Sequence, residues 1–382
     1  MSLLGIDRRR EEFPSLSAGI HLLSHSLGPM PRGAREAMAS YLDRWEAYTR
    51  ENAWKAAWWD LSAEVGGRIA RLLGAAPGSV QPQPNASVAL SAAASCLDFS
   101  SGTRRKIVTT ALEFPTTEYV WREQERTGAR LEVVASEDGV TTPMEKLLDA
   151  IDEETALVSI SHVSYRSSHR LDPGPVVERA RRAGALVLLD VYQSAGVLPL
   201  EVARWGVDFA VGGTIKWLCG GPACGYLYVH PDLAPDLRPR LTGWIAHEEP
   251  FDFAAGPIRY ASGARRFAQG TPGVPGLYSC LPGLDILLEV GPETIAAESR
   301  RRTQRMVEFA LERGWPLRSP SDAADRGGSV MIGAADPEKL EEELARRRVS
   351  VDWRPGVIRV SPHFFNTDEE VEEALATLSE LL

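Results

Sequence analysis

Apolar segments of strand length alternate with amphipathic segments of helix length along most of the chain. Apolar or β-branched runs predict strands over residues 106–110, 130–134, 156–160, 186–189, 207–211 and 226–229. Helices are predicted between most of them, over residues 88–97, 118–127, 143–151 and 176–183. Uninterrupted apolar runs are typical of strands buried on both faces, as in a parallel sheet that helices cover. The pattern therefore predicts an α/β fold on a mainly parallel sheet.

The last third of the chain has a different pattern. A long helix is predicted over residues 293–313 and could bridge two parts of the protein. Beyond it, strands are predicted over residues 329–332, 349–353 and 357–360, and helices over 337–347 and 368–382. Because a chain of 382 residues is too long for one simple core, we expect a second, smaller α+β domain at the carboxyl end.

A helix predicted over residues 44–65 has many aromatic residues. Its residues at helical spacing on one face are Trp54, Trp58, Leu61 and Val65. An earlier patch of the same kind consists of Tyr41, Trp45 and Tyr48. Trp and Tyr are enriched in subunit interfaces. Core packing or a subunit interface therefore explains this pattern better than a ligand cage does.

Composition and charge narrow the classes of function. The formal net charge of −10 argues against non-specific binding to nucleic acid or to an anionic membrane. No apolar run approaches the length of a membrane span. The four cysteines have neither zinc-ligand spacing nor the pattern of a disulfide framework. We therefore expect reduced thiols, no metal site and a cytoplasmic protein.

Candidate chemistry gathers in residues 185–230. Asp190 ends an apolar strand, and Lys216 follows Gly-Gly-Thr with an apolar residue on either side. Pyridoxal phosphate requires a lysine for a Schiff base and a carboxylate near its ring nitrogen. Apolar neighbours would lower the pKa of the lysine and keep its amine nucleophilic. A capping aspartate and a solvated loop lysine would produce the same spacing, so the residues alone leave both interpretations open.

Two further positions suggest anion binding. Ser87 begins an alanine-rich helix, where its hydroxyl and the adjacent backbone N–H groups can bind an anion or simply cap the helix. Arg359 is the only charge in an apolar strand. A guanidinium suits bidentate capture of a carboxylate, although a buried salt bridge would also explain it.

The order of motifs resembles the active-site region of the class V aminotransferases. The chain has D-x-x-Q-x-x-G from Asp190, then V-D-F-A, then G-G-T-x-K-W-L around Lys216 and G-P-x-x-G-Y-L-Y-V. This family belongs to the fold-type I pyridoxal-phosphate enzymes, which also include the kynureninases. The resemblance implies that Lys216 forms the Schiff base and moves the substrate proton. It also implies that Asp190 pairs with the ring nitrogen and that Gln193 lies near the ring hydroxyl.

The resemblance also implies an architecture. The expected fold has a large domain with a mainly parallel seven-stranded sheet flanked by helices, plus a smaller α+β carboxyl-terminal domain. We expect residues 1–30 to pack near the active site and residues 31–262 to form the large cofactor-binding domain. Residues 263–382 would then form the bridging helix and the small domain. Proteins of this kind are generally homodimers with active sites at the subunit interface.

Other contacts follow from matched motifs. The N-A-S turn implies Ala86 and Ser87 as phosphate contacts, and F-P-T implies that Phe114 stacks on the pyridine ring. Thr214 is a further expected cofactor contact. The segment L-T-G-W-I-A-H resembles a kynureninase segment whose tryptophan, here Trp244, contacts the phosphate. In R-F-x-x-G-T-P the threonine, here Thr271, typically reaches the phosphate of the neighbouring subunit.

The expected substrate is a small molecule, an α-amino acid whose side chain the sequence does not specify. In the family the arginine at the place of Arg359, within G-V-I-R-V-S-P-H, holds the substrate carboxylate. The S-L-G-P turn resembles the amino-terminal kynureninase motif near the substrate, which makes Ser26 and its neighbour His25 candidates. Tyr165 stands where most of the group has asparagine and kynureninases have tyrosine.

The motifs leave the reaction open. The S-L-G-P turn, Tyr165 and Gly243-Trp244 favour a kynureninase-like hydrolase that converts kynurenine to anthranilate and alanine. Against it, Gln193, Ile215 and Thr271 stand where kynureninases carry histidine, tyrosine and asparagine. The leading hypothesis is therefore an aminotransferase. A cysteine desulfurase or lyase is a weaker alternative because the usual histidine before the lysine is absent. An inactive scaffold is weaker still, because Asp190, Lys216 and Arg359 are all retained.

Overall fold

The computed structural model describes residues 9–382 and contains the expected central sheet of seven strands. The strand order is β2-β8-β7-β6-β5-β3-β4, and only β8 runs against the others. The strands are β2 (Val80–Gln83), β3 (Lys106–Thr110), β4 (Arg130–Val134), β5 (Thr155–Ser161), β6 (Leu186–Asp190), β7 (Phe209–Gly213) and β8 (Gly225–Val229). The predicted mainly parallel sheet is confirmed. Strand β2 was not predicted, because its sequence VQPQ lacks strand periodicity and it lies at an edge that tolerates proline.

Helices cover both faces of this sheet. In β6, Val187 and Leu189 pack in one core while Leu188 packs in the other, as expected for a strand buried on both faces. The first core includes side chains of α3 (Trp59–Leu72), α7 (Pro173–Ala183) and α9 (Val274–Val290). The second includes side chains of α4 (Ala86–Ala94) and α5 (Pro115–Gln124). The remaining α-helices of this part are α2 (Gly33–Glu46), α6 (Met144–Asp149) and α8 (Val202–Trp205).

Short helical turns complete the large domain. The helix predicted over residues 44–65 is interrupted, because α2 ends at Glu46 and a new helical segment starts near Asn52. The Asn52 side chain accepts hydrogen bonds from the backbone N–H groups of Trp54 and Lys55 and so caps that segment. The short turns are η1 (Pro14–Ser17), η2 (Ala47–Thr49), the π-helical η3 (Trp54–Trp58), η4 (Glu125–Thr127), η5 (Ala234–Asp236), η6 (Trp244–Ala246), η7 (Pro250–Asp252) and η8 (Gly263–Phe267).

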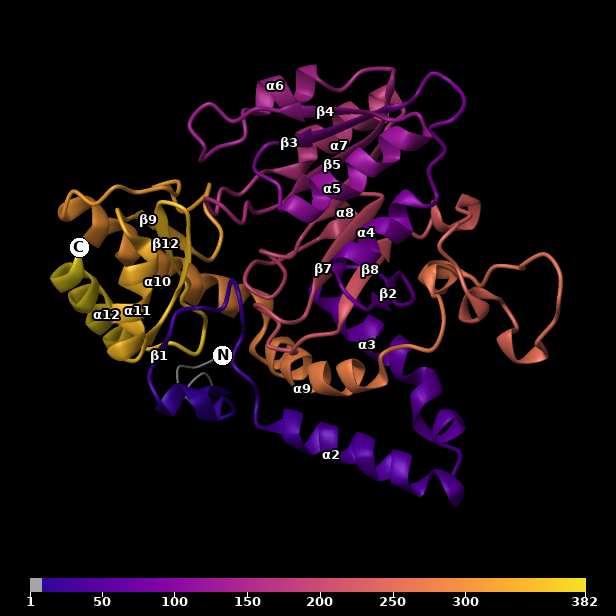
Figure 1. Ribbon diagram of the computed structural model, residues 1–382, viewed down its shortest axis with the longest axis horizontal. Coiled ribbons are helices and arrows are strands. Elements are labelled where there is room, and N and C mark those ends of the chain that lie inside the picture. Colours follow the sequence, from indigo (N-terminus) through magenta and orange to yellow (C-terminus); the bar gives the residue numbers. More distant parts are fainter. Residues whose placement is uncertain (1–8) are drawn as a thin grey trace.

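The small domain lies beside the large sheet (Figure 1). It consists of α10 (Pro292–Glu312), β9 (Val330–Gly333), α11 (Pro337–Arg346), β10 (Val349–Ser350), β11 (Asp352–Arg354), β12 (Val357–Val360) and α12 (Asp368–Leu381). Strands β11, β12 and β9 form an antiparallel sheet. The strand predicted over residues 349–353 is divided, because β10 pairs with β1 (Ile20–His21) and β11 pairs with β12.

The amino-terminal segment is part of the small domain's structure. Strand β1 runs parallel to β10, with hydrogen bonds from Ile20 N to Arg348 O (2.8 Å) and from Leu22 N to Ser350 O (2.9 Å). Ser361 N donates in turn to Leu22 O (2.9 Å). Residues 1–8 of the predicted segment 1–30 lie outside the described residues. Helix α9 packs against α2 and α3 in the large domain's core, so residues 274–290 lie with the large domain rather than with residues 292–382.

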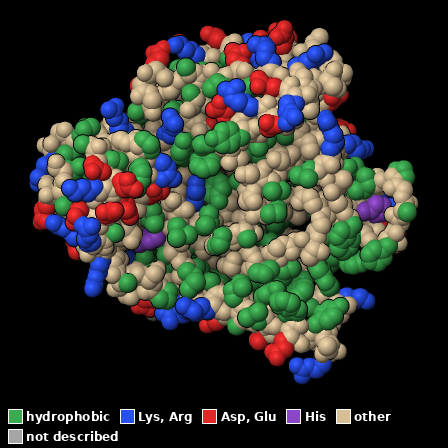
Figure 2. Space-filling view, in the orientation of Figure 1, with side chains coloured by type: hydrophobic (Ala, Val, Ile, Leu, Met, Phe, Trp, Pro, Cys, Tyr) green, Lys and Arg blue, Asp and Glu red, His purple; other side chains and the backbone are tan. Residues whose placement is uncertain are grey.

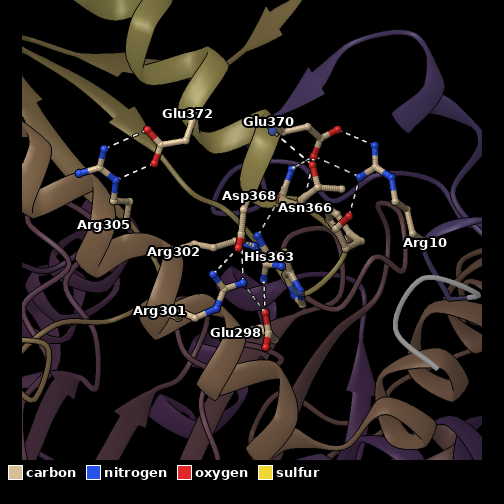
Figure 3. A network of polar contacts seen from close by, with 12 residues as sticks. Arg10, Glu298, Arg301, Arg302, Arg305, His363, Asn366, Asp368, Glu370 and Glu372 are labelled. Atoms are coloured by element: carbon tan, nitrogen blue, oxygen red, sulfur yellow. Dashed lines mark hydrogen bonds and ion pairs between the residues drawn. The ribbon is translucent and has the colours of Figure 1, made fainter. Parts of the chain in front are cut away.

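A polar network anchors this segment further (Figure 3). Arg10 Nη1 donates to Phe365 O (2.5 Å), and Arg10 Nη2 pairs with Glu370 Oε1 (2.5 Å). Asn366 Nδ2 donates to His21 O and to Glu370 Oε2, both at 3.0 Å. One carboxylate thus joins the amino-terminal segment to the turn before α12.

Within residues 9–382, no helix has both the length and the apolar character needed to cross a membrane. No group of three or more His, Cys, Asp or Glu side chains among them is arranged to hold a metal ion.

We expect Arg10→Leu to lower the free energy of unfolding by about 2 kcal/mol, because it leaves the largely buried Glu370 carboxylate without a charged partner. Chemical denaturation followed by circular dichroism measures the change. Arg126→Leu is the control, since the Arg126–Glu123 pair is exposed and should contribute less than about 0.5 kcal/mol. Equal effects of the two substitutions would contradict the anchoring role.

Candidate active site

A cavity of about 220 Å³ opens at the carboxyl ends of the parallel strands. Ser161 ends β5 and Asp190 ends β6, and the two residues are partners in the strand register. Ligands of open α/β sheets bind at this edge. The lining includes several of the predicted residues, namely Ala86, Ser87, Phe114, Tyr165, Asp190, Gln193 and Lys216.

Lys216 lies in the tight loop that follows β7. Its Nζ is 4.2 Å from the centroid of the Tyr192 ring and 5.8 Å from that of Phe114. Burial lowers the pKa of Lys216 to about 8; the charge of Asp190 opposes this shift and that of Arg359 adds to it. The amine is therefore about one tenth unprotonated at pH 7 and about half unprotonated at pH 8, far more than an ordinary lysine.

The S-L-G-P turn packs directly on the lysine loop. Gly28 N donates to Ile215 O (2.8 Å), and a Cβ on Gly28 would lie 2.2 Å from Lys216 O. Only glycine allows so close an approach. The turn is thus in contact with the backbone that carries the lysine.

Asp190 presents a buried carboxylate to the cavity. Its Oδ1 accepts a hydrogen bond from Tyr192 N (2.8 Å), and no described residue donates to Oδ2. Burial raises the pKa of Asp190, while the Tyr192 N–H and the charge of Lys216 act to lower it. A cationic N–H in the cavity would find an acceptor in the free oxygen.

Gln193 is held by two hydrogen bonds. Trp217 Nε1 donates to Gln193 Oε1 (2.9 Å), and Gln193 Nε2 donates to His25 O (3.1 Å). The amide orientation is therefore determined, and the second N–H of Nε2 remains available to an acceptor in the cavity.

The turn before α4 forms another wall. Asn85 caps the helix by accepting from Val88 N (3.0 Å), which leaves Ala86 and Ser87 at the cavity. A Cβ on Gly225 would lie 2.8 Å from Ala86 N and closer still to Asn85. The glycine in β8 therefore allows the helix amino terminus, a favourable position for an anion, to lie against the sheet.

Two aromatic rings meet above the cavity. Phe114, which is 42% exposed, lies 5.1 Å from Tyr165 in an edge-on arrangement. The Tyr165 hydroxyl accepts from Arg166 Nε (3.2 Å). The exposed ring of Phe114 is thus positioned to cover a flat ligand.

Arg359 lies beside the cavity and is 1% exposed. Its Nη1 donates to Tyr165 O (3.1 Å), and its Nη2 forms an ion pair with Asp352. The Nε atom is buried without a partner among the described residues. Burial acts to raise the pKa of Asp352, but the charge of Arg359 outweighs it and holds that pKa well below its usual value.

His25 and Ser26 are not among the residues that line the cavity. Ser361 Oγ donates to Leu22 O (3.0 Å), so the proton between His25 Nδ1 and Ser361 Oγ (2.5 Å) belongs to the imidazole. His25 Nε2 faces Asp352 Oδ2 at 3.7 Å, which is too long for a hydrogen bond. Burial lowers the pKa of His25 to about 3, so the ring is neutral.

Three predicted cofactor contacts lie away from the cavity of their own chain. The Thr214 hydroxyl donates to Gly221 O (3.2 Å) and Cys224 O (3.1 Å). Trp244 is half exposed and packs on Phe253 with ring centroids 6.3 Å apart. Thr271 lines a separate depression.

Several residues at the cavity were not identified from the sequence. Tyr192 lies against Lys216, and burial raises its pKa to about 12. Glu113 lies behind Ser161 and accepts from both its backbone N–H (3.0 Å) and its hydroxyl (2.5 Å). Burial raises the pKa of Glu113 to about 7. In the sequence, Glu113 was recognisable only as a charge next to the predicted Phe114, and nothing distinguished Asp352 from other charged residues.

Fold and sequence together define the class of protein. Residues 21–374 match the family Aminotransferase class-V, and the chain belongs to that family. The chain is 33% identical to the "Uncharacterized aminotransferase YcbU" of Bacillus subtilis (strain 168), over 97% of this chain and 96% of that protein. It is 31% identical to the "Kynureninase" of Pseudomonas fluorescens, over 98% and 91%.

The fold is also that of a solved cysteine desulfurase from Thermococcus onnurineus NA1. The TM-score is 0.87, with 98% of this chain and 97% of that chain covered. At 22% sequence identity this likeness concerns the fold alone. It confirms the predicted large domain with a smaller carboxyl-terminal domain.

The family's cofactor, pyridoxal 5′-phosphate, fits the groups around the cavity. The helix start at Ala86 and Ser87 suits the phosphate, and the free oxygen of Asp190 suits a protonated ring nitrogen. Lys216 would supply the amine, and Gln193 would supply a free N–H. Pyridoxal 5′-phosphate is the cofactor of this enzyme.

The pKa of Lys216 leads to a test with the cofactor-free protein. Because only the unprotonated amine reacts, the rate of cofactor uptake should rise about tenfold per pH unit and level off near pH 8. Stopped-flow absorbance measures this rate. A free lysine derivative should level off only above pH 10, and Asp190→Asn should move the plateau of the protein to lower pH. A protein midpoint above pH 9.5 would contradict the assignment.

Proposed function

We propose that this enzyme is an aminotransferase that acts at the α-carbon of an amino acid. One observation supports the proposal above all. A lysine of lowered pKa and a buried carboxylate line one cavity at the strand ends, and a buried arginine is bonded to Tyr165 in the wall of that cavity. The 33% identity to an aminotransferase-named relative over nearly the whole chain agrees with it.

Each residue has a role in this proposal. The bound cofactor supplies an electron sink for the bonds of the substrate α-carbon. Asp190 Oδ2 holds a proton at the pyridine nitrogen, and the Phe114 ring covers one face of the site. Arg359 binds the substrate carboxylate with its unpartnered Nε and one neighbouring N–H. The Lys216 amine then takes the proton from the α-carbon and returns it.

Hydrolysis of a kynurenine-like substrate is the second candidate. Tyr165 lines the cavity, and the 31% identity to a kynureninase extends over most of both chains. Ile215 provides no phenol before the lysine, but the Tyr192 phenol is close to Lys216 and stays protonated at neutral pH. Tyr192 could therefore donate a proton where the motif lacks a tyrosine.

Desulfurase chemistry has less support. Such a reaction needs a nucleophilic thiolate. Burial raises the pKa of the Cys219 thiol, and it raises that of Cys96 to about 12. The pKa of Cys280 is also raised, by its contact with Cys224 and by burial. These thiols are poor nucleophiles.

The first test is the absorbance spectrum of the cofactor-loaded protein. We expect a band near the visible edge that Lys216→Ala abolishes and that the exposed control Lys146→Ala retains. An α-amino acid should convert this band to that of the pyridoxamine form, and a keto acid should restore it. Production of anthranilate and alanine from kynurenine, without this interconversion, would replace the proposal with the hydrolase. Absence of any band after cofactor is added would contradict both.

We also propose a homodimer whose subunits complete each other's sites. Exposed aromatic side chains occur on and after α2 and in the loop around η7, namely Trp45, Tyr48, Phe251 and Phe253. Hydrophobic side chains gather over α2 and α9 in Figure 2. Trp244 and Thr271, which are remote from the cavity of their own chain, are the residues proposed to reach the partner's phosphate. Large exposed apolar patches are typical of subunit interfaces.

Sedimentation at micromolar concentration should therefore give the mass of a dimer. Trp45→Glu is expected to shift the protein toward monomer by placing a charge in the apolar contact. Leu311→Glu, at an exposed leucine of α10, is the matched control and should leave the dimer intact. A stable wild-type monomer would refute the shared site.

A further inference from the structure

Three charged side chains lie on one face of the small domain's sheet. Asp352 is the register partner of Arg359 across β11 and β12. Arg354 is two residues further along β11, so its side chain leaves the strand on the same side as Asp352. The order on this face is therefore arginine, aspartate, arginine.

The aspartate is bonded to both arginines at once. Arg354 Nη1 donates to Asp352 Oδ1 (2.7 Å), and Arg359 Nη2 pairs with Asp352 Oδ2. Arg359 is the most deeply buried of the three, and the Arg354 side chain is 39% exposed. One carboxylate thus occupies two guanidinium groups.

The cluster acts electrostatically on the catalytic lysine. The charges of Arg359 and Arg354 both lower the pKa of Lys216, while Asp352 raises it. His25 adds no charge, because its ring is neutral. Two arginines and one aspartate leave a single net positive charge beside the cavity, which one carboxylate balances.

We propose that Asp352 determines substrate specificity by occupying Arg354, so that the site accepts amino acids with one carboxylate and disfavours those with a second, acidic side chain. The inference rests on the proposed role of Arg359 in binding the α-carboxylate. It goes beyond that role because it assigns a substrate class.

The surroundings agree with this assignment. A second carboxylate in the substrate would meet Asp352 itself and an arginine that is already paired. Of the residues that line the cavity, only Asp190 and Lys216 are charged, so the lining offers a second carboxylate no arginine of its own. Arg166, the other nearby arginine, is exposed and directed to the Tyr165 hydroxyl, so solvent screens its charge.

Simple acids without an amino group test carboxylate recognition separately from the reaction. Calorimetric titration of the cofactor-loaded enzyme would compare butyrate with succinate, which has the same chain length and a second carboxylate. The wild type should bind succinate no more tightly than butyrate. Asp352→Asn keeps the shape of the side chain and removes its charge. It should therefore increase the affinity for succinate about tenfold and change the affinity for butyrate less than about threefold.

Three further variants identify the cause. Adding Arg354→Gln to Asp352→Asn should remove the gain for succinate, because the released guanidinium is gone. Asp352→Glu keeps the charge and should keep the wild-type preference. Glu342→Gln removes a negative charge from the exposed face of α11 and should change neither affinity.

The outcomes separate this proposal from the proposed function. Wild-type enzyme that binds succinate tenfold more tightly than butyrate would overturn it without any variant. An unchanged preference between succinate and butyrate in Asp352→Asn would also overturn it. So would a loss of binding of both acids in that variant. If wild-type enzyme binds neither acid, the role proposed for Arg359 fails as well, whatever the absorbance tests show.

Discussion

The candidate active site depends on how the backbone around Lys216 is held. Gly28 N donates to Ile215 O, and His363 Nε2 contacts Trp217 O at 3.2 Å. Because His363 Nδ1 accepts from Phe364 N (2.8 Å), Nε2 carries the proton and is the donor. The amino-terminal segment and the small domain thus each bond to the carbonyl of a residue adjacent to the lysine. Neither the large sheet nor the loop alone would determine the position of its amine.

The buried charges around the cavity are balanced by nearby partners. Partial burial makes the Lys216 amine reactive, and the same burial would be costly for Arg359 and Asp190 if they lacked compensating groups. Arg359 has Asp352, and Asp190 has the Tyr192 N–H and the nearby lysine. The unsatisfied groups that remain, Arg359 Nε and Asp190 Oδ2, are those that a carboxylate and a protonated ring can satisfy.

Much of the architecture could be predicted from local pattern. Runs such as 186–189 are apolar throughout, because helices bury both faces of the parallel sheet. Such a run can be recognised without knowing which segments pack against it. Strand β2 and the break near Asn52 escaped prediction, since an edge strand and a helix cap depend on a few polar contacts. The boundary of the small domain was similarly obscured, because α9 looks like any apolar helix until its packing partners are known.

The sequence by itself predicted most of the sheet, the family and the candidate residues Asp190, Lys216 and Arg359, because apolar runs and short ordered motifs are local signals. The tertiary structure alone decided which other side chains reach the cavity. Tyr192 enters it, while the Thr214 hydroxyl turns to backbone carbonyls and His25 packs on Ser361. It also revealed that Asp352 joins Arg354 to Arg359. The physical reason is that side-chain direction and cross-strand pairing depend on packing between segments distant in sequence, which no local pattern records.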